Sequence, residues 1–152
     1  MRTSQIEMEE IFIDALDPDI RLELRGKRHK GMDRFEAAST LLMVAGRGGP
    51  GPVSFDLSVP GYSWMDWMAA RGWDVWTLSF RGFGRSTKPP EILGDPAGKP
   101  PAIRGRTAAR DVEAAVEYIC RRRGVDRVNL LGWSWGTTIS PAYTAEHNER
   151  VG

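Results

Sequence analysis

The sequence predicts an α/β fold in which a mostly parallel sheet carries helices on both faces and begins with an antiparallel pair of strands. Two observations carry this prediction. From residue 41 onward, short apolar runs alternate with segments of helical periodicity, and the first 24 residues instead alternate apolar and polar side chains. Alternating strands and helices are typical of parallel sheets with right-handed crossovers. At 152 residues the chain is long enough for one domain with a real core.

The antiparallel pair is predicted at residues 6–13 and 20–24. Both segments largely alternate apolar and polar residues, and the turn signal Asp17-Pro18-Asp19 lies between them. This pattern is typical of strands with one buried and one solvated face. The charged residues 25–37 follow, and we expect them to form a loop that holds His29.

The remaining strands are predicted from their apolar runs. Residues 41–44 form an unbroken apolar run, as expected for a strand buried on both faces. Further strands are predicted at 73–80 and 128–131. Residues 46–62 hold five glycines and three prolines, so we expect no regular structure there.

Three helices are predicted between and after these strands. The first covers about residues 64–71 and is capped by Ser63. The second runs from a cap at Thr107 to a stop at Gly124, with apolar residues at helical spacing. The third covers about residues 135–148.

Composition and charge exclude several classes of protein. With 21 basic and 20 acidic residues the formal net charge is +1, which predicts neither a nucleic-acid partner nor a membrane partner. A single cysteine, Cys120, rules out an internal disulfide framework and fits a reducing compartment. No segment has the plan of a signal peptide or the length of a membrane span. We therefore expect a cytoplasmic protein.

The most informative motif is Gly-Trp-Ser-Trp-Gly at residues 132–136, which fits G-x-S-x-G. An apolar strand enters it and a helical pattern leaves it, which is the context of a nucleophile turn. Gly132 and Gly136 remove side chains where strand and helix nearly touch. Ser134 is the candidate catalytic nucleophile, and the N–H of Trp135 is free to stabilise an oxyanion.

The loop at residues 45–51 is the candidate source of a second oxyanion donor. Three of its glycines also match G-x-G-x-x-G, the dinucleotide fingerprint. That fingerprint must open directly into a helix, whereas Pro50 and Pro52 intervene here and the nearest predicted helix begins about a dozen residues later. We therefore favour an oxyanion loop and expect no cofactor and no metal.

With these features the chain resembles the N-terminal portion of an α/β-hydrolase fold protein, from about residue 6 to the end. Residues 79–86, Ser-Phe-Arg-Gly-Phe-Gly-Arg-Ser, are similar to the D-x-R-G-x-G-x-S segment of many members, with Ser79 in place of the usual Asp. The resemblance implies an incomplete α/β-hydrolase fold, in which residues 1–152 are the N-terminal part of a single domain.

The same resemblance assigns the second oxyanion donor in two ways. Ala45-Gly46 stands where members usually have His-Gly, which makes Arg47 the donor of the backbone N–H. A shifted match sets residues 47–51 against the H-G-G-P-G of prolyl aminopeptidase-like members and assigns Gly49 instead.

A serine nucleophile implies cleavage of an ester or amide, but it needs a histidine base and an acid. In complete members these residues come later in the chain. His147 is 13 residues beyond Ser134 on the same predicted helix, about 20 Å along its axis. His29 could serve only through a fold-back of the chain.

We therefore expect a serine esterase of small carboxylic esters that is inactive as this portion alone. An aminopeptidase-type amide hydrolase and a non-catalytic half-fold binding protein are the alternatives, and the oligomeric state is open. The indoles of Trp133 and Trp135 flank the serine. Either can shape an apolar pocket, although Trp133 fits the core equally well.

Overall fold

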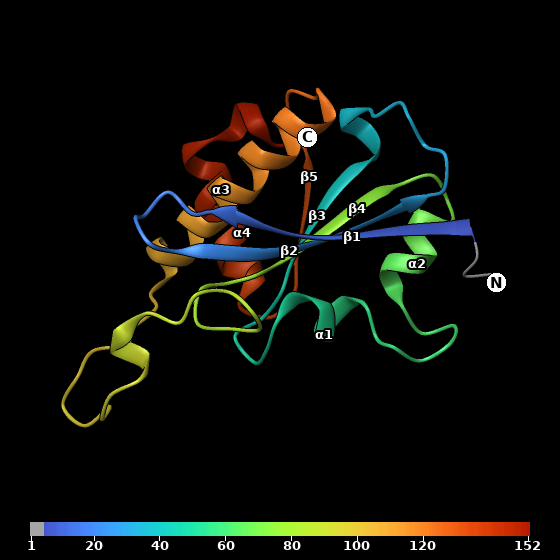
Figure 1. The fold of residues 1–152 in the computed structure, drawn as a ribbon. Helices are drawn as coiled ribbons and strands as arrows, with labels where there is room; N and C mark the ends of the chain where they lie inside the picture. The colour runs from blue at the N-terminus through green and yellow to red at the C-terminus, as the bar shows by residue number, and fades with distance from the viewer. Residues whose placement is uncertain (1–4) are drawn as a thin grey trace.

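A computed structural model describes residues 5–152 as a five-stranded mixed sheet in the order β1-β2-β4-β3-β5 (Figure 1). Residues 1–4 of the predicted domain lie outside the described residues. The three parallel strands adjoin an antiparallel pair at one edge, which confirms the predicted fold class. The strands are β1 (Ile6–Asp14), β2 (Arg21–His29), β3 (Thr40–Val44), β4 (Asp74–Ser79) and β5 (Asn129–Gly132).

Helices cover both faces of this sheet (Figure 1). Leu42 and Val44 of β3 belong to the core that includes buried residues of α3 and α4, whereas Leu41 and Met43 pack with residues of α1 and α2. This two-sided burial explains the unbroken apolar run. The helices are α1 (Gly51–Phe55), α2 (Trp64–Ala69), α3 (Gly105–Arg123) and α4 (Gly136–Glu146), and short 3-10 helices lie at Ala37–Ser39, Pro90–Ile92 and Asn148–Arg150.

The predicted loop at residues 25–37 is wrong in its first part, because β2 continues through His29. The charged side chains of this segment find partners across the sheet. Arg25 donates to Asp56 at 2.8 Å, and the Lys27 ammonium lies 2.6 Å from both Asp56 and Asp66. Such pairing lets a strand that reads as polar remain in the sheet.

The expectation of no regular structure in residues 46–62 is also wrong, because α1 begins at Gly51. The loop after β3 therefore leads into a helix at Gly51, whereas the sequence had predicted the nearest helix about a dozen residues after the loop. Pro52 occupies the first turn, where a missing N–H leaves no hydrogen bond unmade. Proline at this position starts a helix rather than preventing one.

Local signals at the other helices fared unevenly. Ser63 accepts a hydrogen bond from the Asp66 N–H at 3.0 Å, which confirms the predicted cap of α2. Gly124 ends α3 in the left-handed conformation with φ +69°. The cap at Thr107 is wrong, because α3 begins at Gly105 and its N-cap is Arg104, three positions earlier, which makes no side-chain capping bond.

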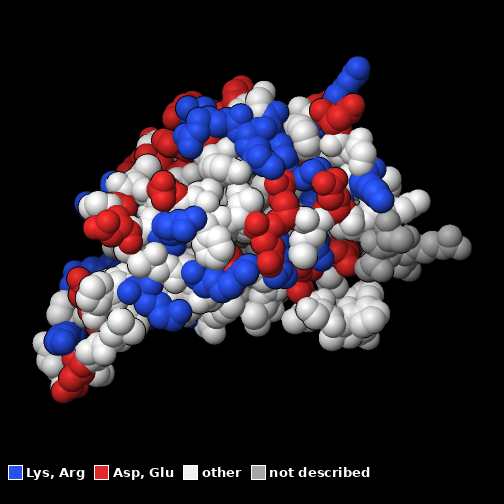
Figure 2. All heavy atoms as spheres, in the orientation of Figure 1, with Lys and Arg blue, Asp and Glu red and all other residues white. Residues whose placement is uncertain are grey.

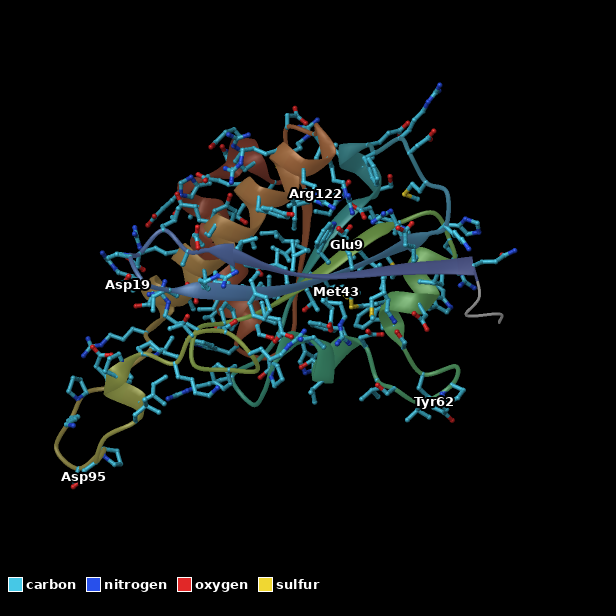
Figure 3. The ribbon with its side chains drawn as sticks, viewed as in Figure 1. Glu9, Asp19, Met43, Tyr62, Asp95 and Arg122 are labelled. Carbon is cyan, nitrogen blue, oxygen red and sulfur yellow. The ribbon has the colours of Figure 1, made fainter. Side chains whose placement is uncertain are left out.

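The β1 edge of the sheet is bound to α3 by ion pairs. The Glu9 carboxylate of β1 accepts from Arg122 at 2.7 Å and also from Arg123 (Figure 3). Acidic and basic side chains interleave over the visible face (Figure 2). Within residues 5–152, no helix is both long enough and apolar enough to cross a bilayer.

Candidate active site

Ser134 lies in a tight turn between β5 and α4, at the C-terminal ends of the parallel strands (Figure 1). Its φ is +55°, and Asp19 is the only other non-glycine residue of the described chain with positive φ. Side chains rarely adopt this conformation, which stores strain that the surrounding structure must hold. Ser134 is exposed in this turn.

The two glycines of the turn are required by close backbone contacts. A Cβ at Gly132 would overlap the carbonyl oxygen of Gly136, and a Cβ at Gly136 would overlap that of Val44. The backbone of Trp133 donates to the Val44 carbonyl at 2.9 Å, so the turn stays attached to β3. Strand, turn and helix are thus in contact through backbone atoms.

The serine turn holds two groups that could take part in a reaction, the Ser134 hydroxyl and the Trp135 N–H. The Ser134 carbonyl accepts from the Thr137 N–H at 3.0 Å and from its hydroxyl at 2.6 Å. Within residues 5–152, neither the Ser134 hydroxyl nor the Trp135 N–H has a hydrogen-bond partner. An unpaired N–H at the start of a helix is suited to bind a developing negative charge.

The loop after β3 lies against the serine. A Cβ at Gly46 would come within 2.8 Å of the Ser134 Cβ and 3.0 Å of its Oγ, so this position has no room for a side chain. Arg47 follows and lines a cavity of about 490 Å³ together with Trp135. The structure therefore brings three of the predicted site residues together. At Gly49, by contrast, a Cβ would meet no atom of another residue within 4 Å.

A second tight turn, at residues 80–87, follows the C-terminal end of β4 and is held by Glu23 of β2. The buried Glu23 carboxylate accepts from the Ser79 hydroxyl at 3.1 Å and from the Arg85 N–H at 3.0 Å and Nε at 2.6 Å. Burial raises the pKa of Glu23, but these hydrogen bonds outweigh burial and hold the pKa below its usual value. Glu23 thus contributes a carboxylate beside Ser79, which occupies the position of the usual Asp.

The same turn is attached to α3 by a buried ion pair. Asp111 accepts from the Arg81 N–H at 3.0 Å and from its guanidinium at 2.9 and 2.5 Å. Asp111 is fully buried, and burial raises its pKa despite the adjacent guanidinium. Arg81 also lies 2.6 Å from the Asp17 carboxylate.

Sequence reasoning missed both carboxylates. Asp111 carried a signal, since it lies on the apolar stripe of α3 beside Ala108 and Ala115, where a charge needs a partner. Glu23 carried none, because it occupies the polar half of an alternating strand.

Neither histidine of the chain lies near Ser134. His29 ends β2, which runs antiparallel to β4. It therefore lies at the N-terminal ends of the parallel strands, whereas the serine turn lies at their C-terminal ends. His147 caps the far end of α4, where its ring stacks on Tyr143 at 4.8 Å and its Nε2 lies 3.7 Å from Glu113. The part of the chain from residue 5 onward contains no group of three or more His, Cys, Asp or Glu residues that could hold a metal ion.

The two tryptophans of the motif have different surroundings. Trp135 packs edge-on against Phe80 with ring centroids 5.6 Å apart, and it lines the cavity. Trp133 is 60% exposed, so its interpretation as a core residue is wrong.

A family model described as alpha/beta hydrolase fold matches residues 40–152. The chain therefore belongs to the α/β-hydrolase fold family. A search of curated proteins finds no significant match.

Solved structures agree on the fold. The epoxide hydrolase VrEH1 of Vigna radiata has a TM-score of 0.68 at 15% identity, over 99% of this chain and 38% of its own. The thioesterase domain from the curacin biosynthetic pathway has a TM-score of 0.66 at 16% identity, over 95% and 42%. A prolyl endopeptidase has a TM-score of 0.70 at 20% identity, over 100% and 21%. The chain thus spans well under half the length of these structures.

Proposed function

We propose that this chain is the N-terminal portion of a serine hydrolase that cleaves small carboxylic esters, with Ser134 as the nucleophile. The observation that carries the proposal is the strained backbone of Ser134, at φ +55° between two glycines that have no room for a side chain. Such strain persists where the surrounding structure maintains it, and it clusters at active sites. A serine at this position suits attack on a carbonyl carbon.

The backbone N–H groups of Trp135 and Arg47 hold the oxyanion in this proposal. Trp135 offers an N–H without a partner within residues 5–152. Arg47 directly follows Gly46, where an added Cβ would come within 2.8 Å of the Ser134 Cβ. This proximity favours Arg47 over Gly49 as the second donor. Two such donors stabilise the tetrahedral intermediate by about 3–4 kcal/mol each.

The base and the acid come from outside residues 5–152 in this proposal. His29 and His147 are placed too far from Ser134 for the hydrogen bond that general-base catalysis requires. We infer that a longer chain, comparable in length to the solved relatives, provides both groups. Without them the serine hydroxyl is a poor nucleophile.

Fluorophosphonate labelling of the full-length protein that the gene encodes tests the proposal. We expect modification of Ser134, located by peptide mass spectrometry, in a product heavier than 16.9 kDa. Ser134→Ala should abolish the labelling, whereas Ser58→Ala, which changes an exposed serine outside the site, should leave it intact.

A folded full-length protein that is not labelled contradicts the proposal and favours a non-catalytic binding protein. An amide substrate is the second candidate, since one structural relative is a prolyl endopeptidase. Turnover of p-nitrophenyl esters against that of proline-containing peptide amides separates the two substrate classes.

A further inference from the structure

The cavity beside the serine turn has an apolar wall to which the proposed catalysis assigns no role. Its volume of about 490 Å³ falls in the range of small-molecule sites, which is roughly 300–1,000 Å³. Trp135 connects the cavity to the serine turn. The other apolar side chains of the wall include Phe83, Ile92, Pro100 and Ile103.

This wall is assembled by Gly82 in the turn after β4. Its φ is +85°, and a Cβ there would lie 2.5 Å from the Cδ1 of Ile92 and 2.7 Å from that of Ile103. The two isoleucines therefore fold directly over the turn. Between them the chain projects away from the sheet, with Asp95 near the tip of the projection (Figure 3).

The charged residues that line the cavity leave an excess of positive charge. They are Arg47, Lys99 and Glu91, which sum to one positive charge at neutral pH. Within residues 5–152 neither cation forms an ion pair, although the guanidiniums of Arg81 and Arg85 near this edge are both paired. Unpaired cations beside an apolar surface favour a ligand that is both apolar and anionic.

We propose that this cavity binds the apolar, negatively charged part of the substrate, so that the preferred ester carries a carboxylate or another anionic group beyond an apolar chain. This inference rests on the proposed hydrolase function, because it assigns the substrate class of the same site. The apolar chain contacts Ile92, Ile103 and Trp135, and the anion lies between Arg47 and Lys99. The ester carbonyl then lies toward Ser134.

Binding to the full-length protein, the same protein that is used for the labelling experiment, tests this assignment without turnover. Octanoate and octan-1-ol serve as probes, because they share an apolar chain and differ in charge. The NMR signal of the Trp135 indole N–H, identified by its loss in Trp135→Phe, reports binding at the cavity. We expect octanoate to bind about tenfold more tightly at low salt, since two exposed ion pairs each contribute a few-fold. The preference should shrink at 0.5 M salt, roughly, as screening increases.

Two changes of opposite sign make the test specific. Arg47→Gln with Lys99→Gln should make the two affinities nearly equal, whereas Glu91→Gln should tighten octanoate alone by a few-fold. The matched control is Lys30→Gln with Arg34→Gln, which removes two cations that do not line the cavity and should change neither affinity. Two-dimensional spectra verify that each variant is folded.

Three results overturn the proposal: neither probe binds, both bind equally, or the preference survives loss of both cations. The outcome is independent of the labelling experiment. If Ser134 fails to label and the anion preference persists, the hydrolase proposal fails while the cavity remains an anion-selective apolar site. If Ser134 labels and the preference is absent, the substrate class alone is wrong.

Discussion

The turns that follow β5 and β4 both lie at the C-terminal ends of the parallel strands, but different interactions hold them in place. The serine turn is fixed by backbone contacts, in which Gly132 and Gly136 remove the atoms that would collide. The turn at residues 80–87 is fixed by ion pairs, the buried pair of Arg81 with Asp111 and the pair of the buried Glu23 with the exposed Arg85. The first depends on residues that are neighbours in sequence, whereas the second depends on partners 30 and 62 residues away.

The largest effect is expected where a buried charge loses its partner. Asp111→Asn leaves the Arg81 guanidinium buried with only Asp17 as an anionic partner. Breaking a buried pair in this way costs about 3–5 kcal/mol of unfolding free energy. Urea unfolding of the variant measures the loss.

Asp17→Asn is the matched control for this comparison. It removes the other carboxylate on Arg81, but Asp17 is partly exposed, with 32% of its side chain accessible. We expect a loss below about 1 kcal/mol, as for other exposed pairs. Equal losses in the two variants would show that burial of Asp111 is not what fixes this turn.

The second effect tests the close contacts of the serine turn. Gly136→Ala places a methyl group on the Val44 carbonyl oxygen, and neither backbone segment can move away freely. We expect a loss of about 2 kcal/mol or more, as for other overpacked sites. Gly48→Ala is the control, because a Cβ there meets no atom within 4 Å. A change within about 0.5 kcal/mol is expected for the control, and a similarly small change at Gly136 would mean that the contact is readily relieved.

The sequence predicted the serine turn because its requirements are local. A glycine two residues before and another two residues after Ser134, an apolar run before the motif and a helical pattern after it are all visible in one segment. The succession of the strands along the chain followed from the same kind of alternation. Boundaries were less accurate where a distant partner decides them, as for β2, whose lysine and arginine side chains pair with Asp56.

The charged turn could not be predicted because its partners are brought together only by the folded sheet. Ser79 looked like a departure from the family pattern, and nothing in the sequence indicated that Glu23 would place a carboxylate beside it. The cavity is a similar case. Arg47, Ile92 and Trp135 come from three separate loops or turns, so only the fold unites them.

The third effect measures the strain stored at the nucleophile position. Ser134→Gly relieves the left-handed conformation, and we expect a gain of about 1 kcal/mol in unfolding free energy. Ser134→Ala keeps the Cβ and therefore the strain, so its stability should stay near that of the parent chain. Denaturant midpoints of the two variants, read side by side, separate strain from loss of the hydroxyl. A glycine variant no more stable than the alanine variant would remove the argument from strain.

The smallest effect concerns the pH dependence of the charged turn. Burial raises the pKa of Glu23, but the bonds from Arg85 and Ser79 lower it further, so the folded pKa lies below the ordinary value of 4.5. The unfolded chain therefore binds a proton at higher pH than the folded chain. The stability contributed by Glu23 is present above about pH 4.5 and is lost as the pH falls through the folded pKa.

Glu23→Gln should remove this contribution. Unfolding free energies measured from pH 7 to pH 3, roughly, should differ between parent and variant by at most about 1 kcal/mol near neutrality, and the difference should narrow with acid. Asp111 acts in the opposite sense, because burial raises its pKa. It is present in both proteins, so the comparison cancels its effect. Glu36→Gln changes an exposed carboxylate and should keep the parent slope. A gap between parent and Glu23→Gln that stays constant down to low pH would mean that Glu23 holds the turn by its shape rather than by its charge.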